Sequence, residues 1–315
     1  MENIPYLNPG LKPLRRKRKN RVRFLLLILI GLIVAYAIFA KLIKPVVPLP
    51  LINPTPNILK TGTSLKNTVE KTMEEAKGTY GIAIKNLKTG ETYYSNEHEV
   101  FGTASLYKLW VMAVVYKQIR NGQLAKDQVL SEDVAVLNQK FSIDPEFAEQ
   151  TEGTITFTVH AALNQMITIS HNYAAMLLSE KIKLSTVADF LKDNKFSESS
   201  IGTDSTPPKS TASDIALFYE KLYKGKLADK EYTDEMISLL RNQQLNNGLP
   251  KYLPDEISVA HKTGEIDFLK HDAGIVFTDK GDYIIIIMSE SDSPAGAQER
   301  IALVSKAVYD YFNEE

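Results

Sequence analysis

The sequence predicts an α+β domain, an α/β sandwich in which helices pack against an antiparallel sheet, preceded by one transmembrane helix. Strand-like runs lie at both ends of the expected domain, near residues 80–95 and 257–289, with helical patterns between them. Because strands bury their apolar faces by meeting in one sheet, these distant runs should pair, with helices packed against them. The third observation is a charge-free apolar run at residues 24–40, which predicts the membrane segment.

Composition excludes several classes of function. The 315 residues suffice for a membrane segment and one sizeable domain, and 44% hydrophobic with 24% charged residues is ordinary for a globular protein. The absence of cysteine excludes disulfides, thiolate catalysis and zinc–thiolate sites. The five histidines show no metal-binding spacing, so we expect neither metal nor cofactor. A net charge of −1 gives no reason to expect nucleic-acid binding.

The N-terminal region predicts a single-pass membrane anchor. A basic tail at residues 1–23 precedes the apolar run, which with its flank forms a span at 24–43. The positive flank should stay in the cytoplasm and send the following chain outside the cell membrane. An A-x-A pattern at Ala35–Ala37 leaves a cleaved signal peptide as the alternative, although it lies inside the apolar run. Five prolines between Pro45 and Pro56 predict an extended linker at 44–63, before a folded domain at 64–315.

The first elements of that domain are a helix and a hairpin. Ser64 can cap a short helix with one apolar face, made of Leu65, Val69, Met73 and Ala76. "YGIAIKN" and "TYYSN" then flank "LKTGE" as two strands of a hairpin. The run 103–122 is helical and ends at Asn121-Gly122.

Helices then continue to the final strands. Residues 157–170 and 171–182 form consecutive helices, the first capped by Thr158, and another helix begins near Ser213. "DAGIVF" and "YIIIIMS" pair across "TDKGD". A closing helix carries the apolar residues Ile301, Val304, Val308 and Phe312.

Ser105 and Lys108 form an S-x-x-K at the start of an apolar helix. Side chains three residues apart share a helix face, so Lys108 could accept the proton of the Ser105 hydroxyl if burial lowers its pKa. The helix N-terminus would add positive potential for a developing oxyanion. Taken alone, a helix cap followed by a surface lysine explains the pattern as well.

Ser170 and Asn172 form the one S-x-N, at the junction of two predicted helices. A hydroxyl and an amide there could relay a proton and hold a substrate carbonyl. Helix capping by Ser170 is the simpler interpretation of the residue taken alone. We expect His171, between them, to be packed or solvated.

Lys-Thr-Gly occurs three times, and the settings differ. Lys60–Gly62 lies in the linker, and Lys88–Gly90 at a hairpin turn. Lys262–Gly264 follows the strand-like run "ISVA", which places Lys262 in the sheet where backbone groups can align a substrate.

S-x-x-K, S-x-N and K-T-G in this order resemble the penicillin-recognising serine enzymes, and the spacings of 65 and 92 residues suit class A β-lactamases. The stretches "TVHAALNQMITISHNYAAMLL", "TGETYYSNEHEVFGTASLYKL" and "AHKTGE" carry the resemblance over nearly all of 64–312. It implies a five-stranded antiparallel sheet with flanking helices and an all-helical subdomain.

The resemblance also implies a role for each motif residue. Ser105 is the acylated nucleophile, Lys108 its base or relay, and Ser170 the proton shuttle to the leaving nitrogen. The remaining residues bind substrate: Asn172 the amide, Lys262 and Thr263 the carboxylate, with Gly264 allowing close approach and the N–H groups of Ser105 and Glu265 forming an oxyanion hole.

The sequence departs from class A β-lactamases where the deacylating base should lie. The family's E-x-x-x-N is missing from the shortened segment after Asn172. Glu198 is the possible base, but Gly202 stands where its asparagine partner should be, and a solvated loop carboxylate is the alternative. His171 replaces the family's usual aspartate. Acylation without efficient deacylation is the profile of penicillin-binding enzymes.

Two functions therefore stay open. The first is a cell-envelope serine hydrolase, monomeric, acting on a β-lactam or a peptidoglycan-derived D-alanyl peptide. The second is a non-catalytic peptidoglycan-binding module that keeps the fold.

Overall fold

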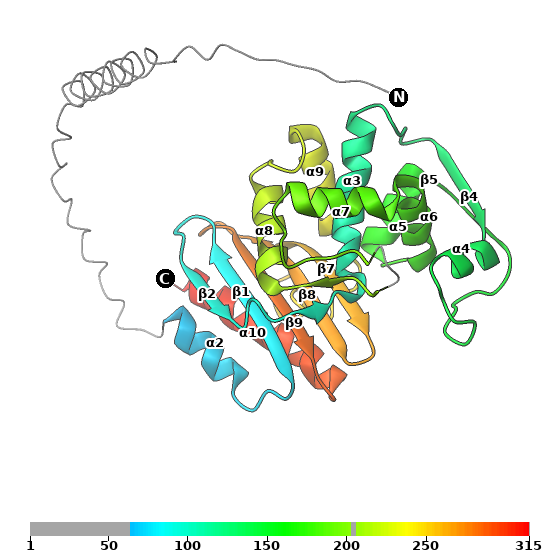
Figure 1. Cartoon of the computed structure of the whole chain (residues 1–315). Helices are drawn as coiled ribbons and strands as arrows, with labels where there is room; N and C mark the ends of the chain where they lie inside the picture. The colour runs from blue at the N-terminus through cyan, green and yellow to red at the C-terminus, as the bar shows by residue number, and fades with distance from the viewer. Residues whose placement is uncertain (1–63, 203–205, 315) are drawn as a thin grey trace, which may run out of the picture. The chain divides into compact units, whose positions relative to one another are not determined.

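The computed structural model describes residues 64–202 and 206–314. Its centre is the predicted five-stranded antiparallel sheet, and the strands lie in the order β2-β1-β9-β8-β7 (Figure 1). The first and last strands of the domain are therefore adjacent, β1 beside β9. The strands are β1 Thr79–Asn86, β2 Thr92–Ser95, β7 Ser258–Ile266, β8 Leu269–Phe277 and β9 Tyr283–Glu290.

Alternate residues of the central strands serve two different cores. In β9, Ile284 and Ile286 face one apolar cluster, and Ile285 and Ile287 face the other. The helices α2 (Leu65–Met73) and α10 (Pro294–Asn313) cover the second face, while α8 (Ala212–Tyr223) packs on the first (Figure 1). A strand with both faces covered reads as a continuous apolar run, which explains "YIIIIMS".

A helical region lies beyond α8 (Figure 1). It contains the 3-10 turn η1 (Ala104–Tyr107) and the helices α3 (Lys108–Arg120), α4 (Val134–Lys140), α5 (Val159–Thr168), α6 (Asn172–Ile182), α7 (Leu184–Asp193) and α9 (Lys230–Arg241). Helix α3 is buried on nearly every side, with Trp110 and Met112 in the large cluster. Such burial fits a central helix surrounded by the others.

The prediction of an all-helical subdomain was wrong. Strands β4 (Val129–Asp133) and β5 (Thr154–Thr158) form an antiparallel ribbon within this region. Their residues alternate, with Leu130 and Ile155 buried and Val129 exposed, as in a half-buried ribbon. A short pair, β3 (Phe101–Gly102) with β6 (Lys209–Ser210), is also present.

Several local predictions were confirmed. Ser64 caps α2 by accepting a hydrogen bond from Asn67 N, and Thr158 caps α5 by accepting one from Ala161 N. Lys88–Gly90 forms the turn between β1 and β2, where Asn86 Oδ1 accepts hydrogen bonds from the N–H groups of Lys88 and Thr89. That Lys-Thr-Gly copy is therefore structural.

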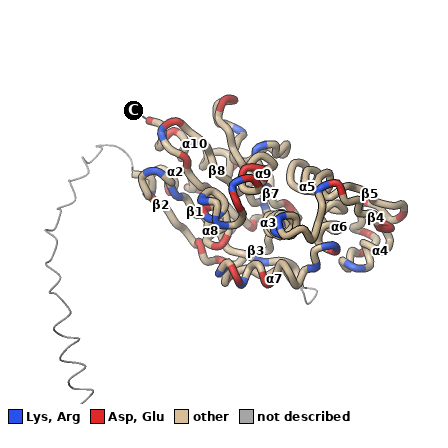
Figure 2. Tube along the Cα trace, turned by 90° about the horizontal axis from the view of Figure 1, so that it is seen from above, with Lys and Arg blue, Asp and Glu red and all other residues tan. Residues whose placement is uncertain are grey.

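The predicted basic tail, membrane span and linker at 1–63 fall outside the described residues. Across residues 64–202 and 206–314, none of the helices combines the length and the apolar character needed to cross a membrane. Acidic and basic residues are interspersed over the described elements (Figure 2).

Candidate active site

Lys108 lies at the centre of the candidate site. It is the first residue of α3 and is fully buried, directly after η1, which carries Ser105. Its Nζ donates hydrogen bonds to Ser170 O at 2.6 Å, to Ser170 Oγ at 3.1 Å and to Asn172 Oδ1 at 2.7 Å. The lysine of the S-x-x-K motif therefore contacts both polar residues of the S-x-N motif, which rules out a surface lysine.

Ser170 does not cap α6, so the capping interpretation was wrong. His171 takes the cap position, and its Nδ1 accepts a hydrogen bond from Ala174 N at 3.3 Å. Ser170 itself has a φ of 60°, in the left-handed region that residues other than glycine seldom adopt. With the cap made by His171, the Ser170 hydroxyl is free to bind the lysines.

Lys262 approaches the same hydroxyl from the sheet. It lies in the edge strand β7, and its Nζ donates to Ser170 Oγ at 3.0 Å and to Thr263 O at 2.8 Å. Ser170 Oγ therefore accepts from Lys108 and from Lys262. Through this hydroxyl, Ser170 at the junction of two helices is bonded to Lys108 of α3 and to Lys262 of the edge strand β7, which lie far apart in the sequence.

Burial shifts the pKa of both lysines downward. Desolvation is the main cause of a pKa well below the ordinary value for Lys108, and the nearby charge of Lys262 adds to it while Glu149 opposes it. Desolvation lowers the pKa of Lys262 to about 7, against the opposing effects of Asp272 and Glu265. A lysine with such a pKa can be neutral near physiological pH, as a general base requires.

Two features hold η1 against the sheet. A Cβ on Gly264 would lie 2.8 Å from Thr103 O, so a glycine lets β7 approach η1 closely. His271 Nε2 makes a hydrogen bond to Gly102 O at 2.8 Å, three residues before Ser105. Ala104, directly before Ser105, has a φ of 44°, and strained backbone of this kind is frequent at functional sites.

A model of the β-lactamase enzyme family matches residues 64–312, most of the chain. The chain belongs to the β-lactamase enzyme family. No curated protein matches the sequence significantly.

Solved structures share the fold of this β-lactamase-family protein. A β-lactamase from Sphaerobacter thermophilus DSM 20745 is 22% identical with a TM-score of 0.69, covering 79% of this chain and 96% of that one. A β-lactamase from Chitinophaga pinensis DSM 2588 is 21% identical with a TM-score of 0.69, covering 79% and 99%. A variant of PBP-A, in an acyl-enzyme complex with penicillin G, is 22% identical with a TM-score of 0.69, covering 80% and 96%.

Within this β-lactamase-family fold, Glu198 is held by other partners than the lysines. Its carboxylate lies 3.0 Å from His98 Nδ1 and accepts a hydrogen bond from Thr211 Oγ1 at 2.9 Å. The hydrogen bond with His98 is the main cause of the lowered pKa of Glu198. The structure therefore does not bring Glu198 into the lysine network.

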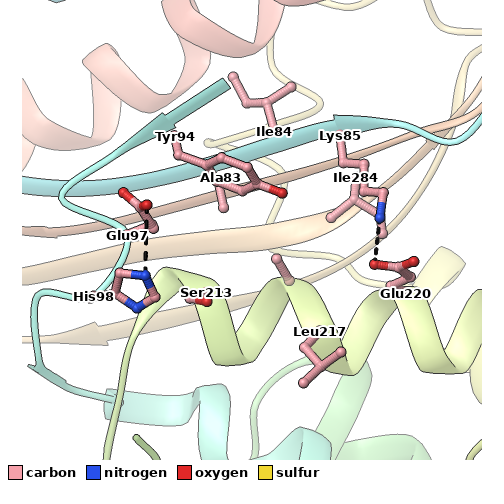
Figure 3. A pocket seen from close by; sticks show the side chains of 11 residues that line it. Ala83, Ile84, Lys85, Tyr94, Glu97, His98, Ser213, Leu217, Glu220 and Ile284 are labelled. Atoms are coloured by element: carbon pink, nitrogen blue, oxygen red, sulfur yellow. Dashed lines mark hydrogen bonds and ion pairs between the residues drawn. The ribbon is translucent and has the colours of Figure 1, made fainter. Parts of the chain in front are cut away.

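His98 also borders a pocket of about 290 Å³ between the sheet and α8. Ala83, Ile84 and Ile284 line its apolar part, with His98 and Glu97 at one end and the Lys85–Glu220 ion pair at the other (Figure 3). Ser105, Lys108, Ser170 and Lys262 are not among its lining residues.

Sequence reasoning missed Glu149. This residue lies between α4 and β5, and its Oε1 accepts a hydrogen bond from Asn172 Nδ2 at 2.6 Å. The one available signal was a run of acidic residues in "SIDPEFAEQTEG", directly before the ribbon strand that leads into α5. No spacing rule connects that run to the S-x-N motif.

The K-T-G residues and Glu265, which we expected to bind substrate, all lie in β7. Thr263 is buried, and Glu265 is exposed at its side chain and pairs with Lys270 at 2.5 Å. The remaining Lys-Thr-Gly copy, at residues 60–62, lies outside the residues that the structure describes.

Proposed function

We propose that this member of the β-lactamase enzyme family is a serine hydrolase in which β-lactams or related D-alanyl peptides acylate Ser105, and in which deacylation is slow. The observation that carries the proposal is the hydrogen-bonded network of Lys108, Ser170 and Lys262 beside the turn that carries Ser105. A buried pair of lysines is costly to maintain unless it has a function.

The network supports a proton path for acylation. Neutral Lys108 takes the proton of the Ser105 hydroxyl as its oxygen attacks the substrate carbonyl and a C–O bond forms. When the C–N bond breaks, Ser170 donates its own proton to the leaving nitrogen and regains one from Lys108. The hydrogen bond from Lys108 Nζ to Ser170 Oγ, 3.1 Å long, gives that route.

Lys262 has two tasks in this scheme. Its charge orients the Ser170 hydroxyl, to which it donates at 3.0 Å, and attracts the carboxylate of the substrate. Asn172 donates an Nδ2 hydrogen to the substrate amide carbonyl, while its Oδ1 accepts from Lys108. Gly264 keeps β7 close enough to η1 for both groups to reach one substrate.

Slow deacylation is supported by the position of Glu198. Its carboxylate is bonded to His98 and Thr211, and Gly202, four residues later in the sequence, offers no amide side chain. A water molecule at the acyl-enzyme then lacks the carboxylate base that class A β-lactamases use. The covalent adduct should persist, as in penicillin-binding enzymes.

The test is to mix the purified protein with labelled penicillin and follow the label over time. We expect stoichiometric labelling that persists for many minutes and disappears in the Ser105→Ala variant. Rapid release of hydrolysed penicillin would identify an efficient β-lactamase. Failure of β-lactams and fluorophosphonates alike to label Ser105 would identify a non-catalytic module.

A further inference from the structure

Glu149 accepts a hydrogen bond from one of the two N–H groups of the amide that we expect to bind the substrate. Its Oε1 lies 2.6 Å from Asn172 Nδ2, whose partner atom Oδ1 is bonded to Lys108. If the second N–H of Asn172 Nδ2 receives the substrate carbonyl, the Glu149 carboxylate lies directly beside that carbonyl. A substituent on the carbon next to the carbonyl therefore lies close to this carboxylate.

The position of Glu149 is built into the fold. The next residue, Gln150, donates its N–H to Tyr173 Oη at 3.1 Å, and its carbonyl accepts from the same hydroxyl at 2.8 Å. Asn138 Nδ2 donates to that carbonyl as well, at 2.8 Å. Since Tyr173 is buried and directly follows Asn172 in α6, the carboxylate and the amide are held by one rigid element.

The hydrogen bonds of the Glu149 carboxylate are only partly satisfied. The Glu149 side chain is exposed, and in the described ranges its second oxygen has no hydrogen-bond partner. Its negative charge also acts on Lys108, whose pKa it raises against the effect of burial. The Glu149 carboxylate, with one oxygen available, therefore lies beside Asn172 Nδ2 and faces solvent.

We propose that Glu149 and Asn172 form a subsite for substrates that carry an ammonium group on the carbon next to the acylamino carbonyl. The inference rests on the proposed function. On binding, the substrate carbonyl accepts from the second N–H of Asn172 Nδ2, and the ammonium forms an ion pair with the Glu149 carboxylate. A neutral substrate makes no such ion pair, so it binds less well.

Benzylpenicillin and ampicillin differ by one amine at this position and make a matched pair of probes. The acylation rate constant of each is measured with the purified full chain at pH 6.5, below the pKa of about 7.7 of an α-amino group. The ratio of ampicillin to benzylpenicillin should fall about fivefold in Glu149→Gln, the upper range for a partly exposed ion pair. Glu152→Gln, from the same segment, is the control and should keep the wild-type ratio.

If Glu149 acts only through Lys108, Glu149→Gln changes the acylation rate constants of both penicillins by the same factor. An unchanged ratio of the two rate constants would therefore overturn the subsite. So would a Glu149→Gln variant that slows hydrolysis of both acyl-enzymes at an unchanged ratio, because Glu149 would then be the deacylating base. Binding to Ser105→Ala separates the subsite from the chemistry. In the Ser105→Ala background, Glu149→Gln should reduce the preference in binding affinity for ampicillin over benzylpenicillin by about the same factor. Equal binding of the two penicillins to Ser105→Ala, or no detectable binding, would contradict the subsite even if labelling of Ser105 succeeds in the wild-type protein.

Discussion

Replacing Lys262 with methionine should change how the stability of the protein depends on pH. Burial lowers the pKa of Lys262 from its ordinary 10.5 to about 7. Between these two values the unfolded chain binds a proton at residue 262 that the folded protein lacks, so this lysine makes the free energy of unfolding rise with pH. The amount by which Lys262 lowers the free energy of unfolding is greatest below pH 7 and vanishes above pH 10.5.

The magnitude follows from the shift. At about pH 6 the shift costs about 5 kcal/mol, and at about pH 9 about 2 kcal/mol, at about 1.36 kcal/mol per pKa unit. The wild-type protein should therefore gain about 3 kcal/mol from this residue between the two pH values. Methionine has similar length and no charge, so Lys262→Met should lose that gain and be the more stable protein at about pH 6.

The assay is urea unfolding of both proteins at the two pH values, because titrating groups that do not interact with Lys262 cancel in the difference between them. Lys108, whose pKa the charge of Lys262 lowers, changes the difference in the same direction. The difference in unfolding free energy should be larger at the lower pH by about 3 kcal/mol. A pH-independent difference would refute the low pKa of Lys262. A Lys262→Arg variant, which keeps the charge, should not gain stability at the lower pH.

Other changes test the remaining parts of the account. Ser170→Ala should lower the acylation rate constant about 10²- to 10⁴-fold, the usual loss when a proton relay is removed; a small effect would remove Ser170 from the path. Gly264→Ala should lower the free energy of unfolding by about 1–3 kcal/mol, because its Cβ would meet Thr103 O, and an unchanged midpoint would contradict the close approach. Glu198→Gln should leave acylation and deacylation rates within about twofold, since surface changes away from reacting groups have small effects; a large loss of deacylation would make Glu198 the base. The full chain should sediment with membranes while a chain starting at residue 64 stays in the supernatant, and equal partitioning would contradict the predicted anchor.

Element types could be predicted from the sequence because their signals are local. The strand at "YGIAIKN" and the caps at Ser64 and Thr158 each depend on a few neighbouring residues, and all three predictions were confirmed. The same kind of signal, the alternation in 129–133 and 154–158, was present for the β4–β5 ribbon and was overlooked.

Contacts within the candidate site were less accessible. Motif order and spacing predicted which residues belong together, but not that Ser170 Oγ would accept from both lysines. That geometry depends on the left-handed backbone at Ser170 and on the cap made by His171, and a sequence shows neither. Glu149 reaches Asn172 because Tyr173 fixes the conformation of an otherwise irregular segment, so no local pattern could have indicated it.

The central claim is that Ser105 is a nucleophile served by the lysine network. Its most direct test is the mass of the intact protein after incubation with benzylpenicillin, followed by mapping of the modified peptide. We predict a mass increase of one whole penicillin, located at Ser105, absent in Ser105→Ala and formed much more slowly in Lys108→Ala. An unmodified protein, or an adduct on another residue, would contradict the account.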